Sequence, residues 1–128
     1  MEYPEELLYN DTHQWARIED NVGTIGITEY AQDQLNDLVY VDLPEVGRTL
    51  TQGEPFGSVE SVKAVSDLIA PVSGKVVAVN ESVRDEPDKI NQDPYGEGWM
   101  VKVELAGAPD MGKLMDAEAY QKFLSEQG

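Results

Sequence analysis

Turn-forming residues interrupt this sequence at short intervals, and the apolar segments between them are short. This spacing is typical of an all-β domain, because brief segments rich in β-branched residues suit strands and clusters of Gly, Pro, Asn and Asp suit turns. The fold class that follows is mainly β. The predicted strands are Trp15–Glu19, Val22–Ile27, Leu38–Leu43, Phe56–Ser61, Val65–Ile69, Lys75–Asn80 and Met100–Glu104.

Two segments have a helical pattern instead. A short helix is predicted near residues 28–36, where Thr28 is a suitable N-cap and apolar residues follow at helical spacing. A second helix is predicted near residues 117–125, behind Asp116 as N-cap. From Tyr120 onward this helix carries apolar side chains at i, i+3 and i+4, a stripe that can dock on a sheet.

Length and composition limit the class of protein. The 128 residues fit one compact domain, residues 1–128, and the absence of cysteine excludes disulfides and thiolate chemistry. Nucleic-acid binding is not expected, because 25 acidic residues oppose nine basic ones and give a net charge of −16. No segment approaches the roughly 20 apolar residues of a membrane span, and the acidic N-terminus resembles no signal peptide. We therefore expect a cytoplasmic protein.

A nearly symmetric segment, ESVKAVSD at residues 60–67, has a lysine at its centre. Folded between Lys63 and Ala64, it predicts a hairpin in which Val62 and Val65 form the closing pair and the acidic ends meet. The turn has neither Gly nor Asn for the positive φ angles of a type I′ turn, so a type I turn is predicted. β-branched residues on both sides favour a firmly held tip.

Three roles can be considered for Lys63. Catalysis would require burial or neighbouring cations to lower the pKa of the amine, whereas its charged neighbours are Glu60 and Asp67. An ordinary solvated lysine and an attachment point for a covalent group both remain. An attachment point would have to be recognised among six lysines, and a protruding rigid turn would allow that by position.

Blocks of sequence spread over nearly the whole chain resemble one known family. They include HQW at residues 13–15, GTIGIT at 23–28, VYVDLP at 39–44, ESVKA at 60–64, APVSG at 70–74 and PYGEGW at 94–99. These blocks are similar to those of the glycine cleavage system H proteins. The resemblance implies a barrel-sandwich hybrid of two small antiparallel sheets, with a lipoyl lysine at a hairpin tip.

The resemblance also implies a role as a covalent carrier, not an enzyme. Lipoate would be amide-linked to Lys63 and would carry the aminomethyl group of glycine. The implied partners are a PLP-dependent glycine decarboxylase, a tetrahydrofolate-dependent aminomethyltransferase, an FAD-containing dihydrolipoyl dehydrogenase, and a lipoate ligase or lipoyl/octanoyl transferase that installs the group. We expect a monomer.

In this family the loaded arm folds back into a cleft, and the resemblance assigns Thr12, Gln14 and Asp67 to that cleft, with Glu60 counted among the same cofactor-binding residues. A carboxylate such as Asp67 can pair with the cationic methylamine. Asp67 could equally be a solvated carboxylate at a strand end. Gln14 departs from the family, which commonly has Glu there, so a second anionic contact is missing.

Two further positions bear on the site. His13, the only histidine, has no partners for a catalytic triad and is expected to be structural, packed beside Trp15. Asn36 stands where the family often has Gly. Asn tolerates a positive φ better than most residues, so the same fold is expected at this helix end.

Other functions remain to be weighed. A biotin carrier typically has methionines beside its lysine, whereas Lys63 lies between Val62 and Ala64. A lipoyl domain of a 2-oxo acid dehydrogenase is usually shorter and reads Asp-Lys-Ala at the tip. A lipoate relay protein, or a β-barrel adaptor that has lost the modification, would share the fold. An enzyme is disfavoured because no nucleophile–base pair or metal-ligand set is evident.

Overall fold

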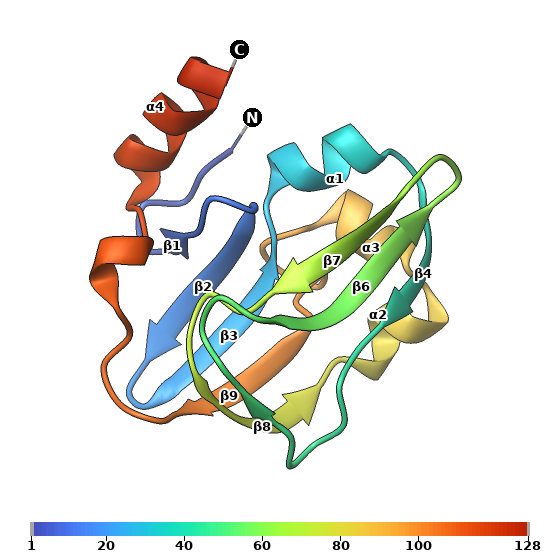
Figure 1. The fold of residues 1–128 in the computed structure, drawn as a ribbon. Coiled ribbons are helices and arrows are strands. Elements are labelled where there is room, and N and C mark those ends of the chain that lie inside the picture. The colour runs from blue at the N-terminus through green and yellow to red at the C-terminus, as the bar shows by residue number, and fades with distance from the viewer. Residues whose placement is uncertain (1, 128) are drawn as a thin grey trace.

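Two antiparallel sheets form the body of the protein in the computed structural model, which describes residues 2–127 (Figure 1). The larger sheet has the strand order β1-β2-β3-β9-β8-β5, and the smaller has the order β4-β6-β7. The larger sheet comprises β1 Leu8–Tyr9, β2 Gln14–Glu19, β3 Val22–Ile27, β9 Val101–Leu105, β8 Gly74–Val79 and β5 Thr49–Leu50. The smaller comprises β4 Leu38–Asp42, β6 Pro55–Ser61 and β7 Val65–Ile69.

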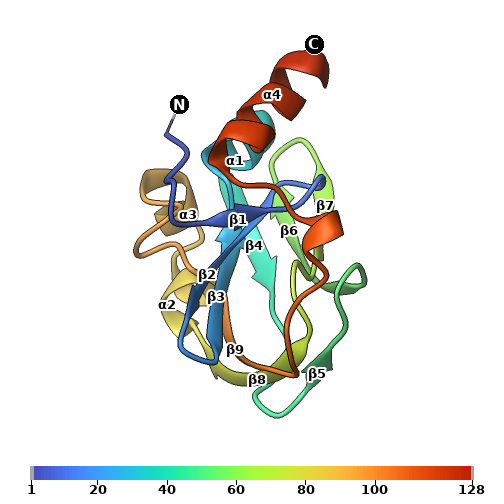
Figure 2. The same ribbon diagram turned by 90° about the vertical axis from the view of Figure 1, so that its left-hand side faces the viewer.

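Short helices lie at the edges of these sheets. They are α1 Glu29–Leu35, α2 Glu81–Asp85, α3 Asp88–Gln92, the 3-10 turn η1 Met111–Lys113, and α4 Ala117–Gln127. Helix α1 lies beside the β6–β7 hairpin, whereas α4 projects from the end of the molecule where the N-terminal segment also lies (Figures 1 and 2). The lysine-bearing tip and α4 are therefore on opposite sides of α1.

The mainly β fold class and both predicted helices are confirmed. Each of the seven predicted strands is present, with its ends within one residue of the prediction. Thr28 caps α1 by accepting a hydrogen bond from the amide of Ala31 at 3.2 Å. Asp116 does the same for α4, accepting from the amide of Ala119 at 2.8 Å. The added elements β1, β5, α2 and α3 have two to five residues each.

Two apolar clusters hold the elements together. The larger lies between the sheets and includes the fully buried Ile25, Leu68 and Val76. The smaller is mainly aromatic and joins α4 to the larger sheet, with Trp15 and Tyr120 both fully buried. Burying an aromatic side chain removes a large apolar area from water, so this second cluster fixes α4 against the start of β2.

The β6–β7 hairpin is present, but its predicted register is wrong. Val65 lies opposite Glu60, and Asp67 lies opposite Ser58. The central residues of the turn are therefore Val62 and Lys63, one residue earlier than predicted. Glu60 and Asp67 lie on the same face of the hairpin as diagonal neighbours, and they do not oppose each other directly.

Candidate functional site

The turn that carries Lys63 is closed by the main chain and by one side chain. The amide of Ser61 donates to the carbonyl of Ala64 at 2.8 Å. The Ser61 hydroxyl oxygen accepts from the amides of Lys63 at 3.2 Å and Ala64 at 3.1 Å. Neither Val62 nor Lys63 has a positive φ, which excludes the primed turn types as predicted. Ser61 is only 4% exposed, so the base of the turn is rigid.

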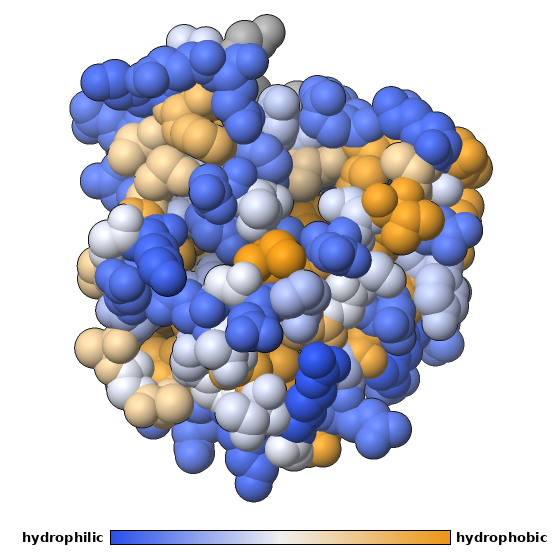
Figure 3. Space-filling model, viewed as in Figure 1, coloured by the Kyte–Doolittle hydropathy of each residue, from blue (hydrophilic) through white to orange (hydrophobic). Residues whose placement is uncertain are grey.

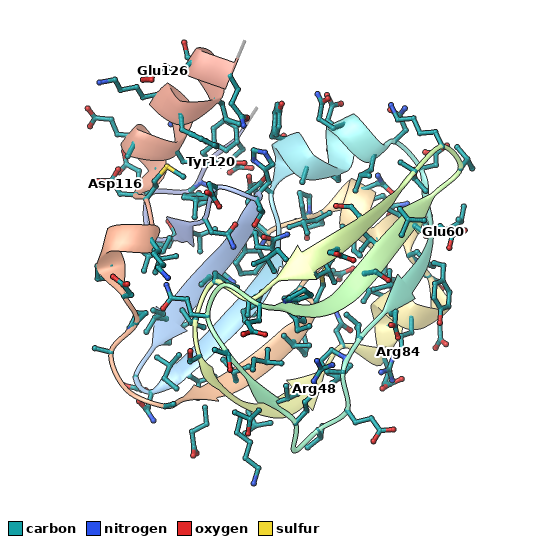
Figure 4. The ribbon with its side chains drawn as sticks, in the orientation of Figure 1. Arg48, Glu60, Arg84, Asp116, Tyr120 and Glu126 are labelled. Carbon is teal, nitrogen blue, oxygen red and sulfur yellow. The ribbon has the colours of Figure 1, made fainter. Side chains whose placement is uncertain are left out.

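The side chains around Lys63 form an exposed apolar rim. Val62 is 74% exposed and Val65 is 66% exposed, and on the neighbouring strand Val39 and Tyr40 are also more than half exposed. Figure 3 shows apolar side chains gathered at the tip of the β6–β7 hairpin. Glu60, labelled in Figure 4, lies on β6 close to this tip and is the acidic group of the rim. An enzyme that acts on Lys63 would meet this surface first.

The Lys63 ammonium rests against the end of α1. The side-chain nitrogen of Asn36 donates to the carbonyl of Asp33 at 3.2 Å. In this orientation the side-chain oxygen of Asn36 accepts a hydrogen bond from Lys63 Nζ at 3.3 Å. Asn36 has φ 64° at the C-cap of α1, as expected from its tolerance of the left-handed region. The ammonium of the unmodified lysine is therefore held at the C-terminal end of α1.

We expect Ser61→Ala to slow lipoylation of Lys63 by about twofold to threefold. Removing the hydroxyl leaves the amides of Lys63 and Ala64 without their acceptor, which loosens the turn by roughly one hydrogen bond's net free energy. The measurement is the initial rate of modification by a lipoate ligase. Ser66→Ala is the control, because the Ser66 hydroxyl makes only a marginal 3.5 Å contact. Equal rates for Ser61→Ala and the parent would contradict this role.

Thr12 and Gln14 lie together at the start of β2. The Thr12 hydroxyl donates to Gln14 Oε1 at 2.6 Å, and Gln14 is 2% exposed. The buried Asn10 ties this segment to β7, because Asn10 Oδ1 accepts from the amide of Gln14 at 2.8 Å and its Nδ2 donates to the carbonyl of Ile69 at 3.3 Å. The Gln14 main chain is thus linked to the end of β7 through Asn10, and Thr12 is held by Gln14.

Asp67 lies on β7 two residues before Ile69 and is exposed. Within residues 2–127, its carboxylate has no hydrogen bond or ion pair with Thr12 or Gln14. At about 3.3 Å per residue, Asp67 lies roughly 13 Å along the strand from Lys63. A lipoyl-lysine arm of about a dozen covalent bonds spans roughly 14 Å, so its end can reach Asp67.

A cavity of about 470 Å³ opens just beyond that point. It lies between the end of β7, the loop before β2, and the segment that leads into α4. Its lining includes Asn10, Asp11, Ile69, Leu114, Met115 and Phe123. Asn10 and Asp11, on the loop that carries Thr12, line this cavity, whereas Thr12, Gln14 and Asp67 are not part of its lining.

His13 has a structural position, but not beside Trp15 as predicted. Its ring packs against Tyr30, Tyr120 and Phe123, with centroid distances of 4.7, 5.8 and 6.1 Å. Burial lowers the pKa of His13 below its ordinary value, with a smaller opposing effect from the carboxylate of Asp11. His13 has a left-handed backbone (φ 74°) and lies before β2, where its ring contacts side chains of α1 and α4.

The structure adds Ser61, Asn10 and Tyr120 to the residues that shape the site. Ser61 could have been found from the sequence, because a Ser hydroxyl before a turn commonly accepts from the amides two and three residues on. Asn10 and Tyr120 act through contacts 59 and 107 residues away in the chain, with Ile69 and His13 respectively. No local pattern indicates such contacts.

Comparison with known proteins identifies the family. A family model described as Glycine cleavage H-protein matches residues 7–127. The chain belongs to this family. A glycine cleavage system H protein from Synechococcus sp. is 58% identical over 124 residues, which cover 97% of this chain and 96% of that protein. Another, from Rubrobacter xylanophilus, is 53% identical over 126 residues, 98% of each chain.

A solved structure agrees with the H-protein fold. The crystal structure of a glycine cleavage system H protein from Mycobacterium marinum matches with a TM-score of 0.89 and 41% identity, covering 95% of this chain and 98% of that chain. The resemblance noted in the sequence is therefore confirmed. No helix within residues 2–127 is both long and apolar enough to cross a membrane. In the same residues, no cluster of three or more His, Asp and Glu side chains could hold a metal ion.

Proposed function

We propose that this H-protein family member is a lipoyl carrier, with lipoate amide-linked to Lys63. Such a carrier would take the aminomethyl group of glycine from a PLP-dependent decarboxylase to a tetrahydrofolate-dependent aminomethyltransferase. Dihydrolipoyl dehydrogenase would then reoxidise it. The observation that carries the proposal is the exposed Lys63 at the centre of a turn whose base is fixed by the buried Ser61.

The residues present fit an attached lipoyl group. Lys63 lies in an exposed turn, so an enzyme can reach its amine, and Asp67 lies four residues further along the chain on β7. When bound, lipoate supplies a disulfide that is opened to accept the one-carbon cargo and re-formed by oxidation. The chain's part is to present the arm and to hold its end. Tethering raises the local concentration of cargo at each partner, which a diffusing small molecule would not achieve.

The cleft residues would act on the charged cargo. The Asp67 carboxylate would pair with an ammonium at the end of the arm. Thr12 and Gln14, which are joined by a hydrogen bond, would offer a neutral hydrogen-bonding pair to the same cargo. Glu60, at the tip, would instead face the enzymes that act on Lys63, for which a basic group is the complementary partner.

The remaining parts of the proposal follow from this role. Residues 1–128 would act as one carrier domain without turnover of its own, monomeric and in the cytoplasm. A lipoate ligase or a lipoyl/octanoyl transferase would install the group. The net charge of −16 favours encounters with basic surfaces on these enzymes.

We expect lipoate to be attached to Lys63 and to none of the other five lysines. The test is peptide mass mapping after incubation of the purified protein with a lipoate ligase, lipoate and ATP. Lys63→Arg keeps the positive charge and should give no adduct. An adduct on Lys75 or Lys89, or a modified Lys63→Arg protein, would overturn the assignment.

A further inference from the structure

His13 is held in an unfavourable backbone conformation between two residues of the proposed cleft. Its φ of 74° lies in the left-handed region, which few non-glycine residues adopt, although His, like Asn and Asp, is found there more often than most. Thr12 precedes His13 in the chain and Gln14 follows it. The φ angle of His13 therefore sets how these two residues are oriented relative to each other. A conformation of this kind persists only where surrounding contacts enforce it.

Tyr120 of α4 provides a hydrogen bond from a part of the chain 107 residues away. Its hydroxyl lies 2.8 Å from His13 Nδ1 and 2.8 Å from Thr28 Oγ1. The main chain adds a second link, because the amide of Thr28 donates to the carbonyl of His13 at 3.0 Å. Tyr120 is fully buried, on the side of α4 that faces the sheet (Figure 4). One hydroxyl therefore joins α4, the start of β2 and the N-cap of α1.

The hydrogen-bond roles in this group follow from its donors and acceptors. Thr28 Oγ1 already accepts from the amide of Ala31. The Thr28 hydroxyl can then donate to Tyr120, and the Tyr120 hydroxyl donates to the unprotonated Nδ1 of His13. Burial raises the pKa of Tyr120 and lowers the pKa of His13, so the phenol stays protonated and the imidazole stays neutral.

We propose that Tyr120 is a positioning residue for the arm cleft, and that α4 sets the geometry of Thr12 and Gln14 by holding His13 in its left-handed conformation. This inference rests on the proposed lipoyl-carrier function. It assigns α4 a role in retaining the cargo, although α4 and the lysine-bearing tip lie on opposite sides of α1 (Figure 1).

The first test uses the unlipoylated protein and compares Tyr120→Phe with Tyr9→Phe. Tyr9 is an equally buried tyrosine, stacked on Tyr120 at 4.6 Å, and its hydroxyl donates to the carbonyl of Pro4 at 2.7 Å. Each variant loses one buried hydroxyl, but only Tyr120→Phe loses the contact with His13. The readout is hydrogen exchange at the amides of Gln14 and Thr28, relative to a core amide such as that of Val103.

Tyr120→Phe should speed exchange at Gln14 and Thr28 at least fivefold relative to Val103, whereas Tyr9→Phe should leave this ratio unchanged. Equal ratios in the two variants would overturn the inference. In the lipoylated, cargo-loaded protein, Tyr120→Phe should also release ammonia or formaldehyde about threefold faster. Faster hydrogen exchange without faster release of ammonia or formaldehyde would place Thr12 and Gln14 outside the cleft and overturn the inference. Lipoate mapped to Lys63 would still support the carrier function in that case.

A pH series separates positioning from a general loss of stability. The groups facing His13 are Asp11, Tyr30, Tyr120 and Phe123. Because the folded-state pKa of His13 is lowered, Nδ1 is unprotonated and accepts from Tyr120 above the ordinary pKa of histidine. This hydrogen bond is lost as the pH falls through the lowered pKa of His13. The difference in Gln14 exchange between the parent and Tyr120→Phe should therefore shrink at acid pH. A constant difference would contradict a link through His13.

Discussion

Exchanging the two residues at the tip, as Lys63→Ala with Ala64→Lys, is expected to reduce lipoylation at least a hundredfold. Lys63 is the second central residue of the turn, and its side chain reaches Asn36 at the C-cap of α1. Ala64 instead lies opposite Ser61, to which it is joined by main-chain and side-chain hydrogen bonds. A lysine at position 64 would leave the hairpin from the face of the buried Ser61 and not from the tip, so its amine would be displaced by several ångströms.

The measurement is the initial rate of ligase modification, with peptide mapping to locate any adduct. Lys63→Ala alone gives the background from the other lysines. Ala64→Lys alone keeps Lys63 in place and should be modified near the parent rate, which shows that the ligase tolerates a larger residue beside its target. If the exchanged lysine were modified as fast as the original, recognition would depend on local composition and not on position.

The strands of the hairpin could be predicted from the sequence, but their register could not. Alternation of β-branched and polar residues indicated strands on both sides of Lys63, and these are present. The near-symmetry of residues 60–67 favoured a fold between Lys63 and Ala64. The structure pairs Glu60 with Val65 instead, because the Ser61 hydroxyl accepts the two amides of the turn and fixes Val62 and Lys63 at its centre. Hydrophobic periodicity does not indicate which side chain accepts the amides of a turn.

The short elements were missed for a different reason. Strands β1 and β5 have two residues each, and helices α2 and α3 have five. Segments this short contain at most one or two periods of a strand or helix pattern. Hydrophobic periodicity in the sequence therefore does not indicate them. Strand β1 forms because other segments supply its hydrogen bonds, as where the amide of Tyr9 donates to the carbonyl of Met115 at 2.8 Å.

The cleft residues were assigned by resemblance, and the structure adds the contacts that hold two of them. Thr12 and Gln14 form one hydrogen-bonded pair, fixed to β7 through Asn10. Asp67 lies on an exposed strand face and has no hydrogen bond with either of them. The link through Asn10 joins segments 59 residues apart, which a single sequence does not indicate.

The last prediction concerns how the cleft holds its cargo. Asp67→Asn should shorten the lifetime of the aminomethyl-loaded form about threefold to tenfold, because a charge-assisted contact becomes a neutral one. Such a contact contributes roughly 1.5–3 kcal/mol when sheltered and about 0.2–1 kcal/mol when exposed. Asp67 is exposed in the unloaded protein. The arm itself would cover it on loading, so an intermediate effect is expected.

Gln14→Glu should act in the opposite direction and lengthen that lifetime about twofold. One carboxylate oxygen would keep the bond from Thr12, and the other would face the cationic cargo. Because position 14 is only 2% exposed, the new charge is costly to bury without the cargo, so the unloaded variant should unfold at a lower denaturant concentration. The lifetime is measured as the release of ammonia or formaldehyde from the isolated loaded carrier, with Glu97→Gln as a charge-neutralising control on the exposed loop before β9. Equal release from the parent, Asp67→Asn and Gln14→Glu would mean that neither side chain touches the arm, and the cleft would have to lie elsewhere on the surface of the carrier.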